Sequence, residues 1–333
     1  MLHRFTRPNR VRLSWPVLHP RCRLYTLCAL CAVSALSALG VAPAIGQEAT
    51  PRAGVAGAAE ELGTLTEPRD PATRVTLATV KLANERSMAA GFFVELPAEL
   101  ADKQKPRECV LVTAHHVLEQ CLGANAVLLL RKRQPNSTYT RVDMPIKTRE
   151  GEMPRWVRHP QHDIAAMRVI LPPDVATQPL PHASLADDRA LRKSGLHVGS
   201  RVLTFGYPMR FEANNAGFPV VRQGGIASFP FVPVALHPTM FIDMNAFAGD
   251  SGGPVIAAPP DRAASNGNGS ATVNATSPDE PLVLGLITGQ VRHDERVTGL
   301  MEERVTHYPL GVAMMIQSQF IRETIALLAN AGQ

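Results

Sequence analysis

Short apolar segments of β type follow one another along most of the chain, separated by turns rich in Gly, Pro and Asn. β-branched and aromatic residues are common in these segments, and none of them has the length or period of a long helix. The candidate strands are Arg74–Leu82, Ala89–Leu96, Cys109–Thr113, Ala126–Arg131, Tyr139–Ile146, Ile164–Leu171, Arg201–Phe205, Val220–Ala227, Met240–Met244, Pro254–Ala257, Leu282–Thr288 and Leu310–Ile316. Many short strands at close spacing predict an all-β fold of barrels or a sandwich.

A proline-rich stretch divides the strands into two groups and marks the predicted domain boundary. We expect a first barrel over residues 73–171, a linker over 172–198 and a second barrel over 199–316. Residues 258–281 interrupt the second group with Ser, Asn, Gly, Ala and Pro, a composition that buries little apolar surface, so this segment is predicted to be a disordered loop.

The last segment, residues 317–333, has the only pattern of a confident long helix. Its apolar residues recur at helical spacing on one side. They are Phe320, Ile321, Ile325, Leu327 and Leu328. We expect this helix to dock on the second barrel.

Residues 1–46 have the order of a secretory signal: a basic head, an apolar run over Leu24–Ile45, then small residues. Cleavage would leave a mature start near Gln47, followed by a flexible lead-in over residues 47–72. Because the apolar run is long, an uncleaved anchor is the alternative, and membrane contact is expected only through this segment. Both interpretations predict an exported protein, periplasmic or secreted.

The formal net charge of the 333 residues is +5, and a basic balance is one feature of nucleic-acid-binding proteins. However, the first 46 residues contribute six Arg and no acidic residue, so 28 basic residues face 29 acidic ones in the remainder. The exported part is therefore close to neutral, and we predict no nucleic-acid partner.

Three of the five cysteines lie in the leader, and its removal would leave Cys109 and Cys121. Two thiols in an oxidising compartment predict one disulfide between them, and such a bridge would bracket His116. Two separate buried thiols are the alternative.

The string Gly249-Asp250-Ser251-Gly252-Gly253-Pro254 carries the strongest chemical signal. A nucleophilic serine needs an exposed hydroxyl and backbone N–H groups aimed at one point beside it, and flanking glycines permit both. Here Gly249 and Ser251 would donate the N–H groups of an oxyanion hole.

A serine hydroxyl also needs a base and a group that orients the base. Leu111-Val112-Thr113-Ala114-His115-His116-Val117 is an apolar strand that leads into a turn bearing histidine. His162-Asp163-Ile164-Ala165-Ala166 places a carboxylate before another apolar strand. The chain thus supplies both groups.

With Thr-Ala-x-His, Asp-Ile-Ala and Gly-Asp-Ser-Gly-Gly-Pro in this order, residues 74–330 resemble the trypsin-like serine peptidases of the chymotrypsin fold, of bacterial exported type. The resemblance implies two six-stranded antiparallel β-barrels with the active site between them. It implies His116 as general base, Asp163 as orienting acid and Ser251 as nucleophile. His116 is preferred to His115 because an aliphatic residue follows it, and His115 is expected to be a packed or solvent-facing imidazole.

The resemblance also implies a substrate site. Thr288, Gly289 and Gln290 would pair with the substrate backbone, and Gly311 lies in the segment resembling the strand that closes the P1 pocket. Asn245, six residues before Ser251, is neutral, so we expect an uncharged, apolar P1 residue in protein or peptide substrates.

No cofactor is implied. His159 and His162 suggest a metal site only together with the His115-His116 doublet, and no further ligand group at regular spacing accompanies them, so no metal is predicted.

Two departures from the family bear on regulation. No Ile-Val-Gly-Gly-like start exists to supply a new N-terminus for Asp250, so Asp250 needs another partner, such as an arginine or backbone N–H groups. No peptide-binding domain is expected after the last helix. The rival interpretation from another class is a catalytically silent or latent binding or adhesion module on the same fold.

Overall fold

The computed structural model describes residues 70–84, 88–101, 104, 107–121, 123–259, 280–298 and 303–329. The leader at residues 1–46, the lead-in as far as residue 69 and most of the predicted loop at 258–281 lie outside these residues. In the described part, no helix has the length and apolar character needed to span a bilayer.

The first half of the described chain forms a seven-stranded antiparallel sheet in the order β5-β4-β1-β2-β3-β9-β8. Its strands are β1 (Thr79–Ala83), β2 (Met88–Glu95), β3 (Glu108–Thr113), β4 (Asn125–Arg133), β5 (Tyr139–Lys147), β8 (Val157–Arg158) and β9 (Ala165–Ile170). Strands β6 (Arg149–Glu150) and β7 (Met153–Pro154) form a separate pair. The all-β fold class is confirmed, and in this first half the described residues form an open sheet of seven strands in place of a closed six-stranded barrel, because β5 and the two-residue β8 at its edges do not pair with each other.

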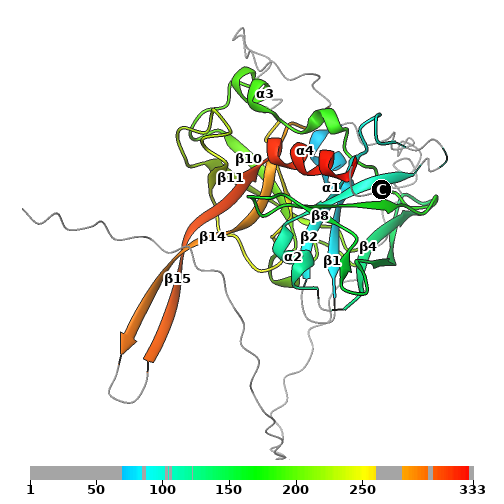
Figure 1. Cartoon of the computed structure of the whole chain (residues 1–333), viewed down its shortest axis with the longest axis horizontal. Helices are drawn as coiled ribbons and strands as arrows, with labels where there is room; N and C mark the ends of the chain where they lie inside the picture. The colour runs from blue at the N-terminus through cyan, green and yellow to red at the C-terminus, as the bar shows by residue number, and fades with distance from the viewer. Residues whose placement is uncertain are drawn as a thin grey trace, which may run out of the picture. The chain divides into compact units, whose positions relative to one another are not determined.

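The second half forms the expected closed barrel of six strands among the described residues, in the order β10-β11-β12-β15-β14-β13 (Figure 1). They are β10 (Arg201–Gly206), β11 (Val220–Ile226), β12 (Thr239–Asp243), β13 (Pro254–Ala257), β14 (Val283–Thr298) and β15 (Glu303–Gln317). The last two strands are far longer than the others and form a ribbon that extends beyond the barrel (Figure 1).

Helices are short and lie at strand ends or between the two halves. The described ones are α1 (Pro71–Ala78), α2 (His115–Glu119), α3 (Asp188–Lys193) and α4 (Ser318–Ala326), with 3₁₀ turns η1 (His182–Ser184), η2 (Pro208–Arg210) and η4 (Leu327–Ala329). The predicted strand at Arg74–Leu82 is wrong in its first half, because Asp70 caps helix α1 by accepting from Thr73 N–H at 2.8 Å and Pro71 fits the first turn.

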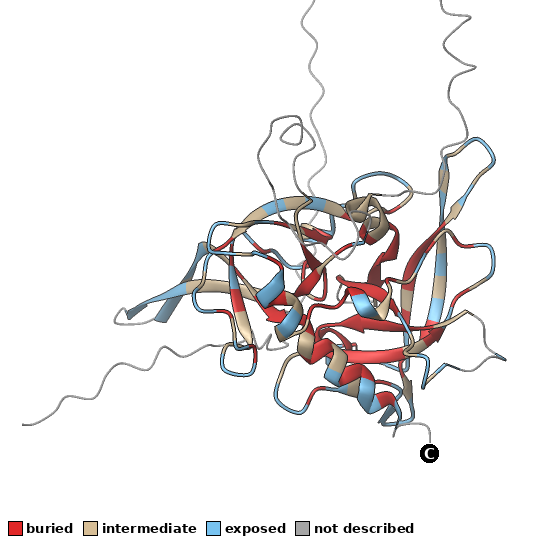
Figure 2. Cartoon of the chain, turned by 90° about the horizontal axis from the view of Figure 1, so that it is seen from above, coloured by how far each residue is buried: buried red, intermediate tan, exposed pale blue. Residues whose placement is uncertain are grey.

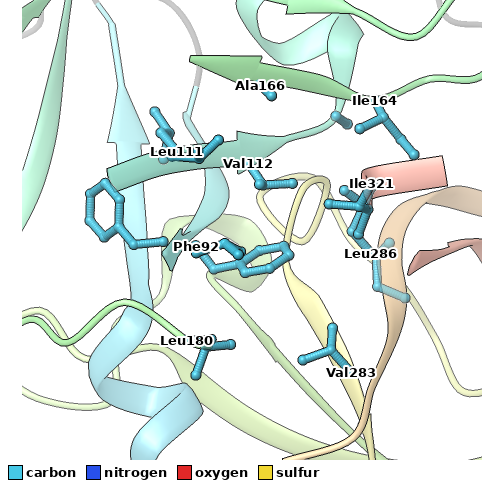
Figure 3. Packing of buried hydrophobic residues seen from close by; sticks show 14 of the residues in the cluster. Phe92, Leu111, Val112, Ile164, Ala166, Leu180, Val283, Leu286 and Ile321 are labelled. Atoms are coloured by element: carbon cyan, nitrogen blue, oxygen red, sulfur yellow. The ribbon is translucent and has the colours of Figure 1, made fainter. Parts of the chain in front are cut away.

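The predicted C-terminal helix is present as α4, which packs on both halves. Its Ile321 lies among buried residues that include Val112 of β3, Ile164 directly before β9, and Leu286 of β14 (Figure 3). The sheet, the barrel and α4 therefore share one apolar core, and the buried residues lie in the interior of the molecule (Figure 2). Burial of this surface fixes the two halves against each other and so fixes any site between them.

Candidate active site

Histidine 116 lies in the first turn of helix α2, directly after β3. Val117 and Leu118 on the same short helix are buried and anchor it to the core of the first sheet. The His116 side chain is 19% exposed, so it lies at the surface of the core and not inside it.

The carboxylate of Asp163 forms two hydrogen bonds with His116. Its Oδ2 lies 2.7 Å from His116 Nδ1, and its Oδ1 accepts the His116 backbone N–H at 2.9 Å. A carboxylate at Nδ1 keeps the proton on that nitrogen, so Nε2 becomes the basic nitrogen of the ring. The histidine is thus oriented in the tautomer that a general base requires.

The turn that carries Asp163 is organised by a buried histidine. The Nδ1 atom of His159 accepts the backbone N–H groups of Gln161 and His162, each at 3.1 Å. Its Nε2 lies 3.3 Å from Glu323 Oε2 of α4. These bonds close the turn one residue before Asp163 and tie it to the C-terminal helix.

The loop that carries Ser251 lies against the strand ends that lead into His116. Ala90 N–H of β2 donates to Ser251 O at 2.9 Å. Gly252 has φ +83°, and a methyl group there would lie 2.2 Å from both Ala90 O and Thr113 Oγ1. It would also lie 3.1 Å from Ala114 N, two residues before His116. Only glycine allows this close approach. It places the Ser251 loop beside the segment that carries His116, to which Asp163 is hydrogen-bonded.

Gly249 and Ser251 present backbone N–H groups at the same corner. The neighbouring amides of Asp250, Gly252 and Gly253 donate to Phe247 O, Ile287 O and Asp250 O. For Gly249 and Ser251, no acceptor is found within the described residues. Gly249 has φ +101°, and a side chain there would collide with Tyr207 O. Within the described residues, these two N–H groups are therefore left without a backbone acceptor beside Ser251.

The buried side chain of Asp250 contacts Arg222 of β11. Arg222 Nη2 lies 2.6 Å from Asp250 Oδ2, and the Phe247 N–H donates to the same oxygen at 2.7 Å. Arg222 Nη1 also donates to Asn245 O at 2.8 Å. Burial raises the pKa of Asp250, and the Arg222 cation opposes that rise. The partner expected for Asp250 is thus present, as an arginine together with a backbone N–H group.

The residues predicted to form the substrate pocket gather beside this loop. Asn245 Oδ1 lies 3.9 Å from the position that a side-chain carbon on Gly311 would take. Gly289 and Gln290 pair with Met314 and Ala313 of β15. Thr288 is buried, and its hydroxyl donates to Met314 O at 3.4 Å. The structure therefore brings one side of the predicted pocket together.

The predicted disulfide is wrong. Cys109 and Cys121 are both buried and free. The Cys109 Sγ contacts Val169 O of β9 at 3.6 Å, whereas the Cys121 Sγ contacts Val117 O of its own helix at 3.3 Å. Burial raises the pKa of Cys109 to about 12, so its thiol is inert at neutral pH.

The other histidines have separate contacts. His115 lies edge to face with Trp156, with ring centroids 5.0 Å apart, and burial lowers its pKa. This is the packed imidazole that the sequence favoured. Across the described residues, no group of three or more His, Cys, Asp or Glu side chains is placed to hold a metal ion.

Sequence reasoning missed the supporting residues Arg222 and His159. Arg222 is one of many basic residues, and its pairing with Asp250 depends on the curvature of the barrel, which no local pattern reveals. His159 was noticed only as a metal candidate. The proline that follows it and the short spacing to Asp163 were the available signals for a turn-forming role.

Comparison with known proteins places these residues in a family context. The model of the trypsin-like peptidase domain matches residues 89–259. None of the curated proteins matches the sequence significantly. One similar solved structure is the Ser343Ala mutant of Rv3671c from Mycobacterium tuberculosis H37Rv, in an inactive form. Its sequence is 15% identical, and the TM-score is 0.41. The alignment covers 78% of this chain and 91% of that chain. A human astrovirus serine protease is also 15% identical with a TM-score of 0.35, covering 73% of this chain and 90% of that one.

Proposed function

Since this chain belongs to the trypsin-like peptidase family, we propose that it is an exported serine endopeptidase that cleaves protein or peptide substrates through an acyl-enzyme. His116, Asp163 and Ser251 form its catalytic triad. The observation that carries the proposal is the pair of hydrogen bonds between the Asp163 carboxylate and His116, one at Nδ1 and one at the backbone N–H. These bonds orient the His116 ring, and a general base for the hydroxyl of Ser251 requires this orientation.

The geometry supports the following sequence of steps. Ser251 Oγ attacks the scissile carbonyl while His116 Nε2 takes the hydroxyl proton. The N–H groups of Gly249 and Ser251 bind the oxygen that becomes negative. The imidazolium, held by Asp163, then donates its proton to the leaving amine. Water repeats the sequence on the acyl-enzyme and releases the second product.

We propose further that the oxyanion loop is ordered without a newly liberated N-terminus. The Arg222 cation and the Phe247 N–H already occupy Asp250 Oδ2, the position that would need a positive partner. Activation by cleavage of a zymogen is therefore not required for the Gly249 and Ser251 N–H groups to converge.

The preferred P1 residue is proposed to be uncharged and apolar, because Asn245 supplies no charge at the predicted pocket. The substrate backbone would pair with Thr288–Gln290 as an added strand. Cleavage profiling with a peptide library varied at P1 should give its best rates with aliphatic or aromatic residues. A best rate with Arg or Glu would contradict this preference.

Export is proposed from the basic, apolar and small-residue order of residues 1–46, and it fits an enzyme that acts on proteins in the periplasm or outside the cell.

Labelling with a fluorophosphonate probe tests the activity directly. The folded wild-type protein should react, Ser251→Ala should not react, and His116→Ala and Asp163→Asn should each slow labelling by about 10³-fold or more. His115→Ala, in the adjacent position, is the matched control and should label at nearly the wild-type rate. A folded wild type that does not label would favour the silent or latent binding module instead.

A further inference from the structure

The ribbon formed by β14 and β15 continues directly from the active site. Strand β13 pairs with β14 only through Pro254–Ile256, opposite Leu286–Val283. Beyond that point β14 runs on to Thr298, paired on one side with β15 as far as Glu303. Among the described residues, no strand pairs with the other edge of this part of β14. We propose that this edge binds the N-terminal side of extended polypeptide substrates, well beyond the residues next to the scissile bond.

The first backbone groups of this edge are already bound to the nucleophile loop. Ile287 N–H donates to Gly253 O at 2.9 Å, and Gly252 N–H donates to Ile287 O at 2.7 Å. These glycines are the first and second residues after Ser251. The free edge of β14 therefore begins beside the proposed nucleophile, and β-bulges at Ile287/Gly289 and Val291/Arg292 lie between it and the outer ribbon.

The direction of β14 decides which side of the substrate lies on it. The strand starts at Val283, meets the Ser251 loop at Ile287 and leads outward to Thr298 (Figure 1). A polypeptide antiparallel to it has its C-terminal end at Ile287 and its N-terminal residues farther out. The nine residues from Gln290 to Thr298 span about 30 Å at roughly 3.3 Å per residue. That length accommodates several substrate residues beyond the P1 to P3 positions.

The side chains of the outer ribbon stabilise its two strands and leave the edge polar. Asp294 pairs with Arg292 at 3.1 Å and with His307 across the ribbon at 2.6 Å, and Arg296 pairs with Glu303 at 2.6 Å. These ion pairs join residues of the ribbon, whose outer part is exposed (Figure 2), and the large exposed apolar side chains Val297, Val305 and Tyr308 stand among charged ones. A polar edge of this kind binds by backbone hydrogen bonds, which tolerate many sequences.

The occupant that fits is the substrate itself. A two-stranded ribbon in water is only marginally stable, and a third strand would stabilise it. A second copy of the chain would supply a third strand equally well, but nothing would relate its position to Ser251. Continuity of the edge with Gly252 and Gly253 favours the substrate. The substrate class is then a polypeptide that is unfolded over about ten residues before the scissile bond.

The inference rests on the proposed peptidase activity, and peptides of increasing length test it. The full-length protein is assayed with Ala-Ala-Pro-Leu-aminomethylcoumarin, and with the same substrate extended at its N-terminus by three or six residues of alternating Thr and Val. We expect kcat/KM to rise about tenfold from the shortest to the longest, mainly through KM. N-methylation of alternate residues in one register of the extension should remove this gain, and in the other register it should not.

A shortened ribbon provides the matched variant. His293 and Tyr308 are cross-strand partners, so residues 294–307 can be replaced by Asn-Gly, a sequence suited to a two-residue turn. This variant should label with the fluorophosphonate and cleave the shortest substrate as the wild type does, but lose the gain with length. Labelling and cleavage without any length dependence would overturn the inference alone. Failure of every substrate together with absent labelling would overturn the proposed activity as well.

Discussion

The Arg222–Asp250 pair shows how one residue decides the state of a whole loop. Asp250 is 2% exposed, so its charge is costly unless a cation accompanies it, and Arg222 is that cation. The pair lies behind Gly249 and Ser251, whose N–H groups are the proposed oxyanion donors. Arg222 thus acts on the reaction only through the backbone that it holds.

We predict that Arg222→Met destabilises the protein by about 3–5 kcal/mol at pH 7, because it leaves a buried carboxylate unpaired. It should also slow fluorophosphonate labelling. The raised pKa of Asp250 sets the pH dependence: its contribution to stability is fully present below the ordinary value of 3.8 and is lost as pH rises through the higher folded value. Without Arg222 that folded value rises further, so the stability gap to wild type should widen between pH 4 and pH 7.

Urea unfolding of both proteins across that pH range measures the gap. The control is the double variant Arg222→Met/Asp250→Asn, which carries no buried charge at this position, so its own stability should lack the loss with rising pH that the single variant shows. A gap of constant size in the single variant would mean that the Asp250 charge is satisfied by other groups.

At the scale of elements, local patterns located most strands but not their partners or their full length. The strand expected at Arg74–Leu82 begins as helix α1, although the capping pair Asp70-Pro71 was visible in the sequence. The ribbon was expected as two ordinary strands, because the polar outer residues lack the apolar alternation that marks a half-buried strand. The closed first barrel was expected from the family resemblance, and the disulfide was expected from the oxidising compartment. Strand closure and the distance between two thiols both depend on tertiary geometry, which neither the resemblance nor the compartment determines.

The contact of α4 with the Asp163 turn connects the C-terminus of the described chain to the catalytic corner. Phe320 is 6% exposed, and its ring centroid lies 4.0 Å from that of His162 and 5.5 Å from that of His159. His159 in turn accepts the N–H groups that close the turn. Helix α4 therefore supports the position of Asp163 from behind.

We predict that Phe320→Ala costs about 3–5 kcal/mol of stability through the cavity that it leaves. The loosened turn should also reduce kcat more than it raises KM. Leu327→Ala on the same helical segment is the control, because Leu327 is 37% exposed and should cost less than about 1 kcal/mol. Thermal unfolding and peptide hydrolysis measure both effects. Equal kinetics in the two variants would show that Asp163 does not depend on this contact.

For the molecule as a whole, hydrogen bonds from one buried arginine connect the two halves in addition to the apolar core. Arg131 of β4 is fully buried and donates to Thr79 O and Tyr207 Oη, each at 2.8 Å, and to Gly217 O at 2.9 Å. Tyr207 and Gly217 belong to the segment between β10 and β11. Tyr207 N–H donates to Gly249 O at 3.2 Å, so the first sheet reaches the oxyanion loop through two residues.

This chain of contacts predicts that the two halves unfold together because of Arg131. Arg131→Met removes the Arg131 donor from Thr79 O and leaves Gly217 O with only the Tyr207 hydroxyl at 3.3 Å, at a cost of about 2–4 kcal/mol. The matched control is Lys132→Met on the same strand, because Lys132 and its partner Asp174 are about half exposed and their pair contributes about 1 kcal/mol or less. In wild type and control, circular dichroism and fluorophosphonate labelling should follow the same urea transition. In Arg131→Met, labelling should fail at lower urea than the secondary structure, because the oxyanion loop loses its support from the first sheet before either half unfolds. Coincident transitions in that variant would show that the apolar core alone couples the halves.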